Sequence, residues 1–465
     1  MLNTEAIIMT KDMTKGSTLK NILAFCLPMT AGSLFQQLYN MVDSIIVGQY
    51  VGVEAFSAVG LVGSVMFLVI GTAVGMCSGF SIPIAQRFGA EDFKGMRRTL
   101  FNAVVLAGII ALVLTSVTTV LADDLLRIMS TPKELFSHAY RYLFVIFLGI
   151  PITIFYNLLC SILRALGDSK TPLRYLLISS VLNVVLDLTL IIGFKLGVAG
   201  AAIATIASQL IAGLLCLRHM VRNVAVISMD TDDKKIDVSL MVHIFTIGMP
   251  MAFQFSITAV GSIILQTAVN KLGPNCVAAM AAGQKIQNFI AQPMETLGVT
   301  IATFGGQNLG AGRFDRIHKG AREVLAAELI YSSLIAVFVF FCGDVLAQIF
   351  IKKDSADYLL ILENMRHFLR VTCLFYPVLG VLFLFRSLLQ GLGFSAVTML
   401  AGCMELAARC IVAFGFISRY AFNAAVFASP IAWAAAALLL SILYVFIIRK
   451  AERSLGAKAV PATVQ

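Results

Sequence analysis

Twelve long runs of apolar residues dominate the sequence, and each is long enough to cross a lipid bilayer as a helix. A helix rises ~1.5 Å per residue, so a hydrocarbon core of ~30 Å needs roughly 20 apolar residues. The runs lie near 20–48, 55–84, 99–122, 140–162, 173–194, 198–217, 241–270, 276–306, 323–345, 367–391, 395–418 and 424–448. Charged residues make up only 13%, against ~25% in a soluble domain. The sequence therefore predicts an all-α integral membrane protein with twelve transmembrane helices.

Several other classes are disfavoured by the same sequence. The apolar runs lack the period-two alternation of a membrane barrel. The nine cysteines form no CxxC pair and the five histidines match no metal-site spacing, so we expect no metal beyond Na⁺. No phosphate-binding Gly-x-x-x-x-Gly-Lys-Ser/Thr loop and no nucleic-acid motif occurs, so direct use of ATP has no support and we expect no nucleic-acid partner. We expect a protein that is not an enzyme and has no cofactor other than a coupling ion.

The two halves of the chain are similar. Residues 86–93 match residues 307–314 at four of eight positions, and residues 161–169 match residues 387–395 at five of nine, with offsets of 221 and 226. Six helices per half give two parallel repeats, with an N-lobe (1–229) and a C-lobe (230–465) around a central cavity. The charged segment 221–239 is the expected linker. This plan favours transport over a receptor or an anchor.

Basic residues predict the orientation. Most of the 35 Lys and Arg residues fall in the loops that share a side with the N-terminus. Positive loops stay in the cytoplasm, so we expect a multi-pass protein of the plasma (inner) membrane with both termini inside. We expect a monomer, with a small organic substrate and the bilayer as its partners.

Five short motifs carry a family resemblance that extends over essentially the whole chain. They are Pro28, the segment Gln36-Gln-Leu-Tyr-Asn-Met-Val-Asp-Ser-Ile-Ile-Val-Gly48, the Gln-x-x-Gly-Ala loops that begin at Gln86 and Gln307, the segment Arg164-Ala-Leu-Gly-Asp-Ser-Lys-Thr-Pro172, and Asn183-Val-Val-Leu-Asp187. With these motifs the chain resembles the multidrug and toxic compound extrusion family, and looks most like the bacterial branches that include the DNA-damage-inducible type. The resemblance implies export of amphipathic, often cationic compounds, driven by inward flow of protons or sodium ions.

The resemblance also implies a set of site residues. The family's cation site in the N-lobe falls on Asp43, Asn157, Asn183, Asp187 and Thr205, and its helix-bending proline falls on Pro28. A branch of the family carries its coupling carboxylates in the C-lobe instead. The positions here that correspond to Asp43 are Ile264 and Leu265, which makes C-lobe coupling less expected.

The spacing of the polar residues supports a site in the N-lobe. Asn183 and Asp187 are four residues apart and share one helix face, and both fall in the outer half of their span. A carboxylate in the centre of a spanning helix raises the free energy of membrane insertion by ~2.5–3.5 kcal/mol, so we expect these residues to have a function. The residues could carry a proton, enclose Na⁺, or hold helices together as a hydrogen-bonded polar cluster.

Further polar stripes predict a substrate cavity. In the first span, Gln36, Tyr39 and Asn40 lie on the face of Asp43. The stripe of the eighth span consists of Gln284, Asn288, Gln292 and Glu295, and the seventh span contributes Gln254. Glu295 is the leading candidate to attract a cationic substrate, and interhelical packing is the alternative for the stripe. Glu405 and Arg409 are four apart, so we expect them to form a structural ion pair.

A lipid-linked saccharide flippase of similar fold is the alternative function. Such a protein would be expected to present cationic residues to hold pyrophosphate, and Lys285 and Arg409 are the main intramembrane candidates. The acidic residues favour the exporter. A membrane-embedded enzyme would need a metal or nucleophile constellation, and the sequence shows none.

Overall fold

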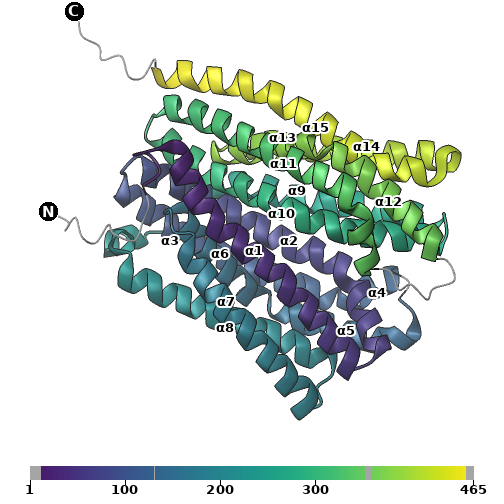
Figure 1. Ribbon diagram of the computed structural model, residues 1–465. Coiled ribbons are helices and arrows are strands. Elements are labelled where there is room, and N and C mark those ends of the chain that lie inside the picture. The colour runs from purple at the N-terminus through teal and green to yellow at the C-terminus, as the bar shows by residue number, and fades with distance from the viewer. Residues whose placement is uncertain (1–11, 130, 351–357, 457–465) are drawn as a thin grey trace, which may run out of the picture. The chain divides into compact units, whose positions relative to one another are not determined.

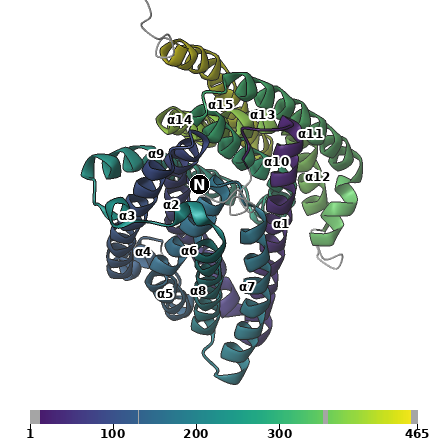
Figure 2. The ribbon, with the colours of Figure 1, turned by 90° about the vertical axis from the view of Figure 1, so that its left-hand side faces the viewer.

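The described part of the chain, residues 12–129, 131–350 and 358–456 of a computed structural model, contains helices and no β-strand (Figures 1 and 2). The first half consists of α1 (Thr18–Tyr50), α2 (Val53–Gly89), α3 (Phe93–Val120), α4 (Ala122–Ile128), α5 (Lys133–Leu148), α6 (Ile150–Ala165), α7 (Lys170–Leu188), η2 (Thr189–Gly193) and α8 (Val198–Asn223). The second half consists of η3 (Ala225–Ile227), η4 (Thr231–Lys234), α9 (Val238–Asn270), α10 (Pro274–Gly310), α11 (Phe314–Phe350), α12 (Tyr358–Leu374), α13 (Tyr376–Gly391), α14 (Ser395–Ile411), η5 (Val412–Phe416) and α15 (Ile417–Gly456).

The described helices fit the predicted twelve-helix membrane fold. Eight helical stretches are long and apolar enough to cross a bilayer, and two bent pairs, α5 with α6 and α12 with α13, bring the number to ten. The stretch Ser395–Glu452 has 58 residues, about twice what one span needs. It breaks at Ala421, whose φ of 48° is not helical, and therefore suffices for two spans. The remaining span is α10, which carries the polar stripe.

The secondary structure repeats along the chain. Helices α1 and α9 both have 33 residues, and α2 and α10 both have 37. The bends within the two paired spans are 50° and 52°. A π-helical segment follows α7 and another follows α14. Gly167 and Gly393, which the repeated sequence windows share, both have positive φ (86° and 91°), a conformation that glycine adopts without strain. These features confirm the two six-helix repeats.

Residue contacts divide the chain into two compact units with boundaries of their own. Among the described residues, unit 1 consists of residue 12 and 24–256, and unit 2 of 13–23 and 257–456. Each repeat therefore begins with a helix that belongs to both units: α1 passes from unit 2 to unit 1 after Leu23, and α9 from unit 1 to unit 2 after Ser256. The lobe boundary at 229/230 describes the sequence repeat and stays a prediction.

In unit 1, the apolar core lies among α2, α3, α5, α6 and α8, with Phe80, Met96, Phe147 and Leu163 fully or almost fully buried. The start of α9 packs against α2 at close range. A Cβ on Gly79 would lie 2.5 Å from the Cα of Gly248, so only glycine permits this approach. Small residues at such crossings allow backbones to pack closely in membranes.

In unit 2, the segment before α1 is held by the end of α10 and the start of α11. The Met13 amide donates to Gln307 Oε1 at 2.9 Å, and the Met13 carbonyl accepts from Asn308 (3.3 Å) and Arg316 (2.9 Å). Arg316 also donates to the carbonyl of Gly16 at 2.8 Å. Met13 is fully buried, so this segment is an integral part of unit 2.

The predicted linker lies between α8 and α9, as expected, and is fixed to α3. Arg97 donates to Asp233 Oδ2 at 2.5 Å, and Asn102 donates to the carbonyl of Lys235 and accepts from the amide of Asp237. The Arg97 hydrogen bond lowers the pKa of Asp233 below its usual value. The ion pair therefore contributes stability at neutral pH and loses it as the pH falls through that lowered pKa.

Candidate functional site

Two polar side chains lie buried in unit 1 on one face of α7. Asn183 is 1% exposed and Asp187 is 0% exposed. Within the described residues, neither the Asn183 amide nor the Asp187 carboxyl has a hydrogen-bond partner. A buried polar group without a partner costs ~1–3 kcal/mol, more if it is charged. Asp187 is also two residues from the π-helical segment η2, an irregularity that often marks functional positions.

Asp43 of α1 belongs to the same cluster. Its carboxyl group interacts electrostatically with Asp187 of α7, which places the two predicted aspartates together. Tyr39 lies one turn before Asp43 and within its electrostatic range. Tyr142 of α5, 6% exposed, lies within electrostatic range of both aspartates. The sequence analysis missed Tyr142, because a single tyrosine in an apolar run resembles any packed aromatic residue.

The other two predicted cation ligands bond within their own helices. The Asn157 amide donates to the carbonyl of Thr153 at 2.8 Å, and the Thr205 hydroxyl donates to the carbonyl of Ala201 at 3.1 Å. Neither bonds to the aspartates in the described part of the chain. The carboxyl groups of Asp43 and Asp187 with the amide of Asn183 therefore form the cluster that the structure brings together. The assignment of all five residues to cation coupling stays a prediction.

The predicted substrate-cavity residues have varied exposure. Gln36, Asn40, Asn288 and Glu295 are exposed, Tyr39, Gln284 and Gln292 are half-buried, and Gln254 is buried. Gln292 donates to Glu295 at 3.3 Å, so the last two residues of that stripe interact along α10. The role of these residues in substrate binding stays a prediction.

The expected pair of Glu405 and Arg409 is confirmed in unit 2, and it is part of a larger group. Arg409 donates to Glu405 at 3.4 Å within α14, and Arg386 of α13 also donates to Glu405. All three side chains are at most 11% exposed. Gly261 of α9 leaves room for Arg409, because a Cβ there would lie 3.1 Å from its guanidinium. Arg386 lies within α13, and its side chain is 11% exposed.

A further buried carboxyl group in unit 2 was missed by the sequence analysis. Glu328 of α11 is 0% exposed, and neither of its carboxyl oxygens has a hydrogen-bond partner among the described residues. Its Oε2 lies 3.1 Å from where a Cβ of Gly380 would stand, so the glycine of α13 makes room for the carboxyl. An acidic residue within the apolar run 323–345, away from Glu323 and Asp344 at its ends, was the signal that could have identified it.

Replacing Glu328 with methionine is expected to stabilise the purified protein. The substitution keeps the volume similar and removes a buried group that lacks a partner, worth ~1–3 kcal/mol. The melting temperature in detergent, measured by loss of native fluorescence or by aggregation, should rise by a few degrees. A fall in melting temperature would contradict this expectation and would indicate that the carboxyl holds a proton or cation that the fold needs.

The comparison with known proteins finds the same family in both repeats of the chain. The sequence profile of the MatE family matches residues 28–189 and 250–414, once in each half and together well over half of the chain. The chain belongs to the MatE family. This match confirms the resemblance drawn from the motifs. Members of this family are membrane transporters, not enzymes. Placement in the DNA-damage-inducible branch stays a prediction.

Similar proteins and solved structures support the same assignment to the MatE family. The chain is 28% identical over 382 residues to the probable multidrug resistance protein YpnP of Bacillus subtilis, covering 82% of this chain and 84% of that protein. It is 23% identical over 378 residues to a protein of Shewanella oneidensis named FAD transporter, covering 79% and 81%. A transporter structure from Pyrococcus furiosus superposes with a TM-score of 0.87 at 22% identity, covering 97% and 99%. That structural likeness shows the fold.

Proposed function

We propose that this MatE-family transporter is a secondary antiporter that exports amphipathic or cationic organic compounds in exchange for H⁺ or Na⁺. The observation that carries the proposal is the cluster in unit 1 of two buried residues, Asn183 and Asp187, with the half-buried Asp43 beside them. Its oxygens lie in a low-dielectric interior without protein donors to compensate them. A proton or a sodium ion bound there would supply the compensation, and its release would restore the cost.

Pro28 offers a way to connect the cluster with movement. As a proline it cannot donate to the carbonyl of Ala24, four residues earlier in α1. Ala24 is also the first residue of α1 that belongs to unit 1. Neutralising Asp43 and Asp187 would favour a different packing of α1, and the missing hydrogen bond lets the helix bend at this point. Bending would alter the substrate site and release the substrate.

The flippase alternative finds less support in the structure. Of the two cationic residues that were candidates to hold pyrophosphate, Arg409 is bound by Glu405, which leaves Lys285, an exposed residue of α10. The orientation with both termini in the cytoplasm is part of the proposal, since the termini themselves lie outside the described residues.

Transport by purified protein in liposomes tests the proposal. A proton gradient or a sodium gradient is imposed across vesicles that contain the protein and a cationic fluorescent dye. Dye movement is compared with that in protein-free vesicles. Dye movement under either gradient supports antiport and names the ion. Because one relative is named an FAD transporter, an anionic dinucleotide is tested in parallel. Movement of the anion alone, or of a lipid-linked saccharide alone, would overturn the proposed substrate class.

A further inference from the structure

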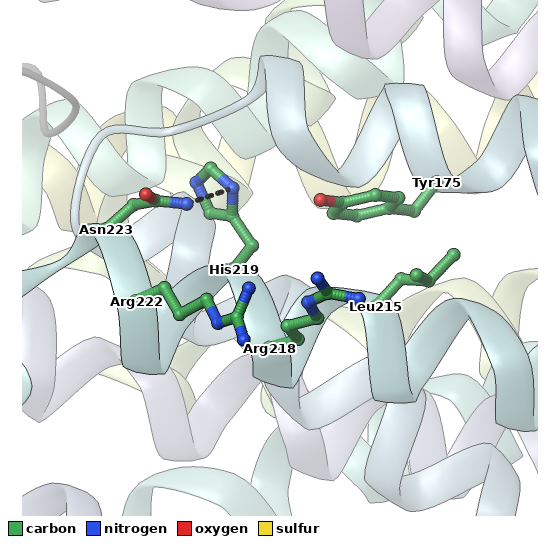
Figure 3. A pocket seen from close by; sticks show the side chains of 6 residues that line it. All are labelled: Tyr175, Leu215, Arg218, His219, Arg222 and Asn223. Atoms are coloured by element: carbon green, nitrogen blue, oxygen red, sulfur yellow. Dashed lines mark hydrogen bonds between the residues drawn. The ribbon is translucent and has the colours of Figure 1, made fainter.

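A recess opens in unit 1 between the end of α8 and the first turns of α7. It has a volume of about 370 Å³ and is lined by Tyr175, Leu215, Arg218, His219, Arg222 and Asn223 (Figure 3). Five of these six side chains carry polar groups. None of the six has a part in the proposed transport cycle.

His219 makes the wall of the recess rigid. It is 8% exposed, and its Nε2 lies 3.3 Å from the Thr171 hydroxyl and 3.7 Å from Asp168 Oδ2. Its Nδ1 lies 3.1 Å from the Asn223 amide, and its ring meets the Tyr175 ring edge-on at 6.2 Å. The histidine thus connects both helices and fixes the position of Asn223.

Two guanidinium groups on this wall lack a counter-charge. Arg218 and Arg222 are four residues apart on α8 and project toward the opening, with Tyr175 of α7 opposite (Figure 3). Neither arginine forms an ion pair or hydrogen bond with any described residue, whereas Arg97 and Arg98, near the same linker, both pair with aspartates. Like charges at this spacing repel by ~0.2–0.5 kcal/mol. An anion between them would remove this repulsion, and guanidinium groups bind phosphate with two parallel hydrogen bonds.

The surface around the two arginines is apolar and exposed. Leu214 is 51% exposed, Leu217 37% and Val221 71%, all on the spanning helix α8. On α7, Ile178 and Val181 are 49% and 68% exposed. In a membrane these side chains face lipid, so acyl chains would lie directly beside the recess. A free phosphate would use the arginines but would leave this apolar surface unused.

We propose that this recess binds the phosphodiester headgroup of an anionic phospholipid. Arg218 and Arg222 pair with the phosphate, the Tyr175 hydroxyl and the Asn223 amide donate to its oxygens, and the acyl chains lie on the apolar surface of α7 and α8. Basic pockets between spanning helices bind anionic headgroups in this way. The proposal does not depend on the proposed transport function.

Native mass spectrometry of the delipidated full-length protein tests the site. Phosphatidylglycerol and phosphatidylcholine are titrated separately onto the wild type and onto the double variant Arg218→Gln/Arg222→Gln. The matched control is Lys170→Gln/Arg174→Gln, which removes two exposed charges with the same spacing at the same end of α7. The wild type and the control should prefer phosphatidylglycerol, and the recess variant should bind it about tenfold more weakly. Tyr175→Phe, which removes a single hydroxyl, should weaken it about threefold.

Three results would overturn the proposal. Equal loss in the recess variant and in the control would mean that general surface charge attracts the lipid. Equal retention in both would mean that the recess does not bind it. Thermal protection of the wild type by inorganic phosphate or glycerol phosphate, to the same extent as by phosphatidylglycerol, would assign the recess to a soluble anion instead.

Discussion

Asp187→Asn should abolish gradient-driven dye transport and leave the fold intact. The asparagine has the same shape, but its amide cannot take up a proton and is a weaker cation ligand than a carboxylate. Uphill dye movement in liposomes should fall to the level of protein-free vesicles under either ion gradient. The melting temperature should stay equal or rise slightly, because the buried carboxyl of Asp187 lacks a hydrogen-bond partner in the described structure.

A matched control separates coupling from general charge effects. Asp124→Asn makes the same chemical change on the short helix α4, where the side chain is exposed. This variant should keep wild-type transport. If Asp187→Asn also kept it, the cluster would have only a packing role between helices, and the coupling site would have to be sought elsewhere.

Glu405→Met should destabilise unit 2 strongly. The substitution removes the acceptor of two buried arginines, Arg386 and Arg409, and leaves their charges uncompensated. Breaking a buried pair by removing one partner costs ~3–5 kcal/mol. The melting temperature in detergent should therefore fall by roughly 5 °C or more.

Two further variants define the origin of that loss. Glu363→Gln alters an exposed carboxylate of α12 and should leave the melting temperature unchanged within about 1 °C. The double variant Glu405→Met/Arg409→Met removes one charge of each sign and should recover part of the stability. If the double variant lost more stability than the single variants Glu405→Met and Arg409→Met lose together, the ion pair would not be the source of the effect.

Much of the fold could be predicted from sequence. Spans in lipid must be long and apolar, so the apolar runs of the sequence predict where they lie. The offsets of 221 and 226 between the matching windows then reappear as equal helix lengths and paired π-helical segments. Helix α10 is the exception: the run 276–306 was predicted as a span, but the helix lacks an apolar window of spanning length, and its place in the repeat is what supports it as a span.

The candidate site was predictable only in part. The spacing of four residues put Asn183 and Asp187 on one face, and the structure buries both. The closeness of Asp43 to Asp187 depends on how α1 packs, which spacing within one helix cannot reveal; it rested on the family resemblance. The contact of Arg386 with Glu405 could not be predicted from spacing, because the two residues lie on different helices, α13 and α14, and only tertiary packing brings them together.

The hydrogen bonds between Met13 and unit 2 have a consequence for how the protein folds during synthesis. The Met13 amide bonds to Gln307, which leaves the ribosome 294 residues later. At ~5–20 residues per second, Met13 waits roughly 15–60 s for its partners. During that time, the segment before α1 lacks the end of α10 and the start of α11 that bury it. A nascent chain stopped after the first six helices would therefore expose this segment to quality-control proteases, and the N-terminal repeat cannot mature before the C-terminal repeat has been made.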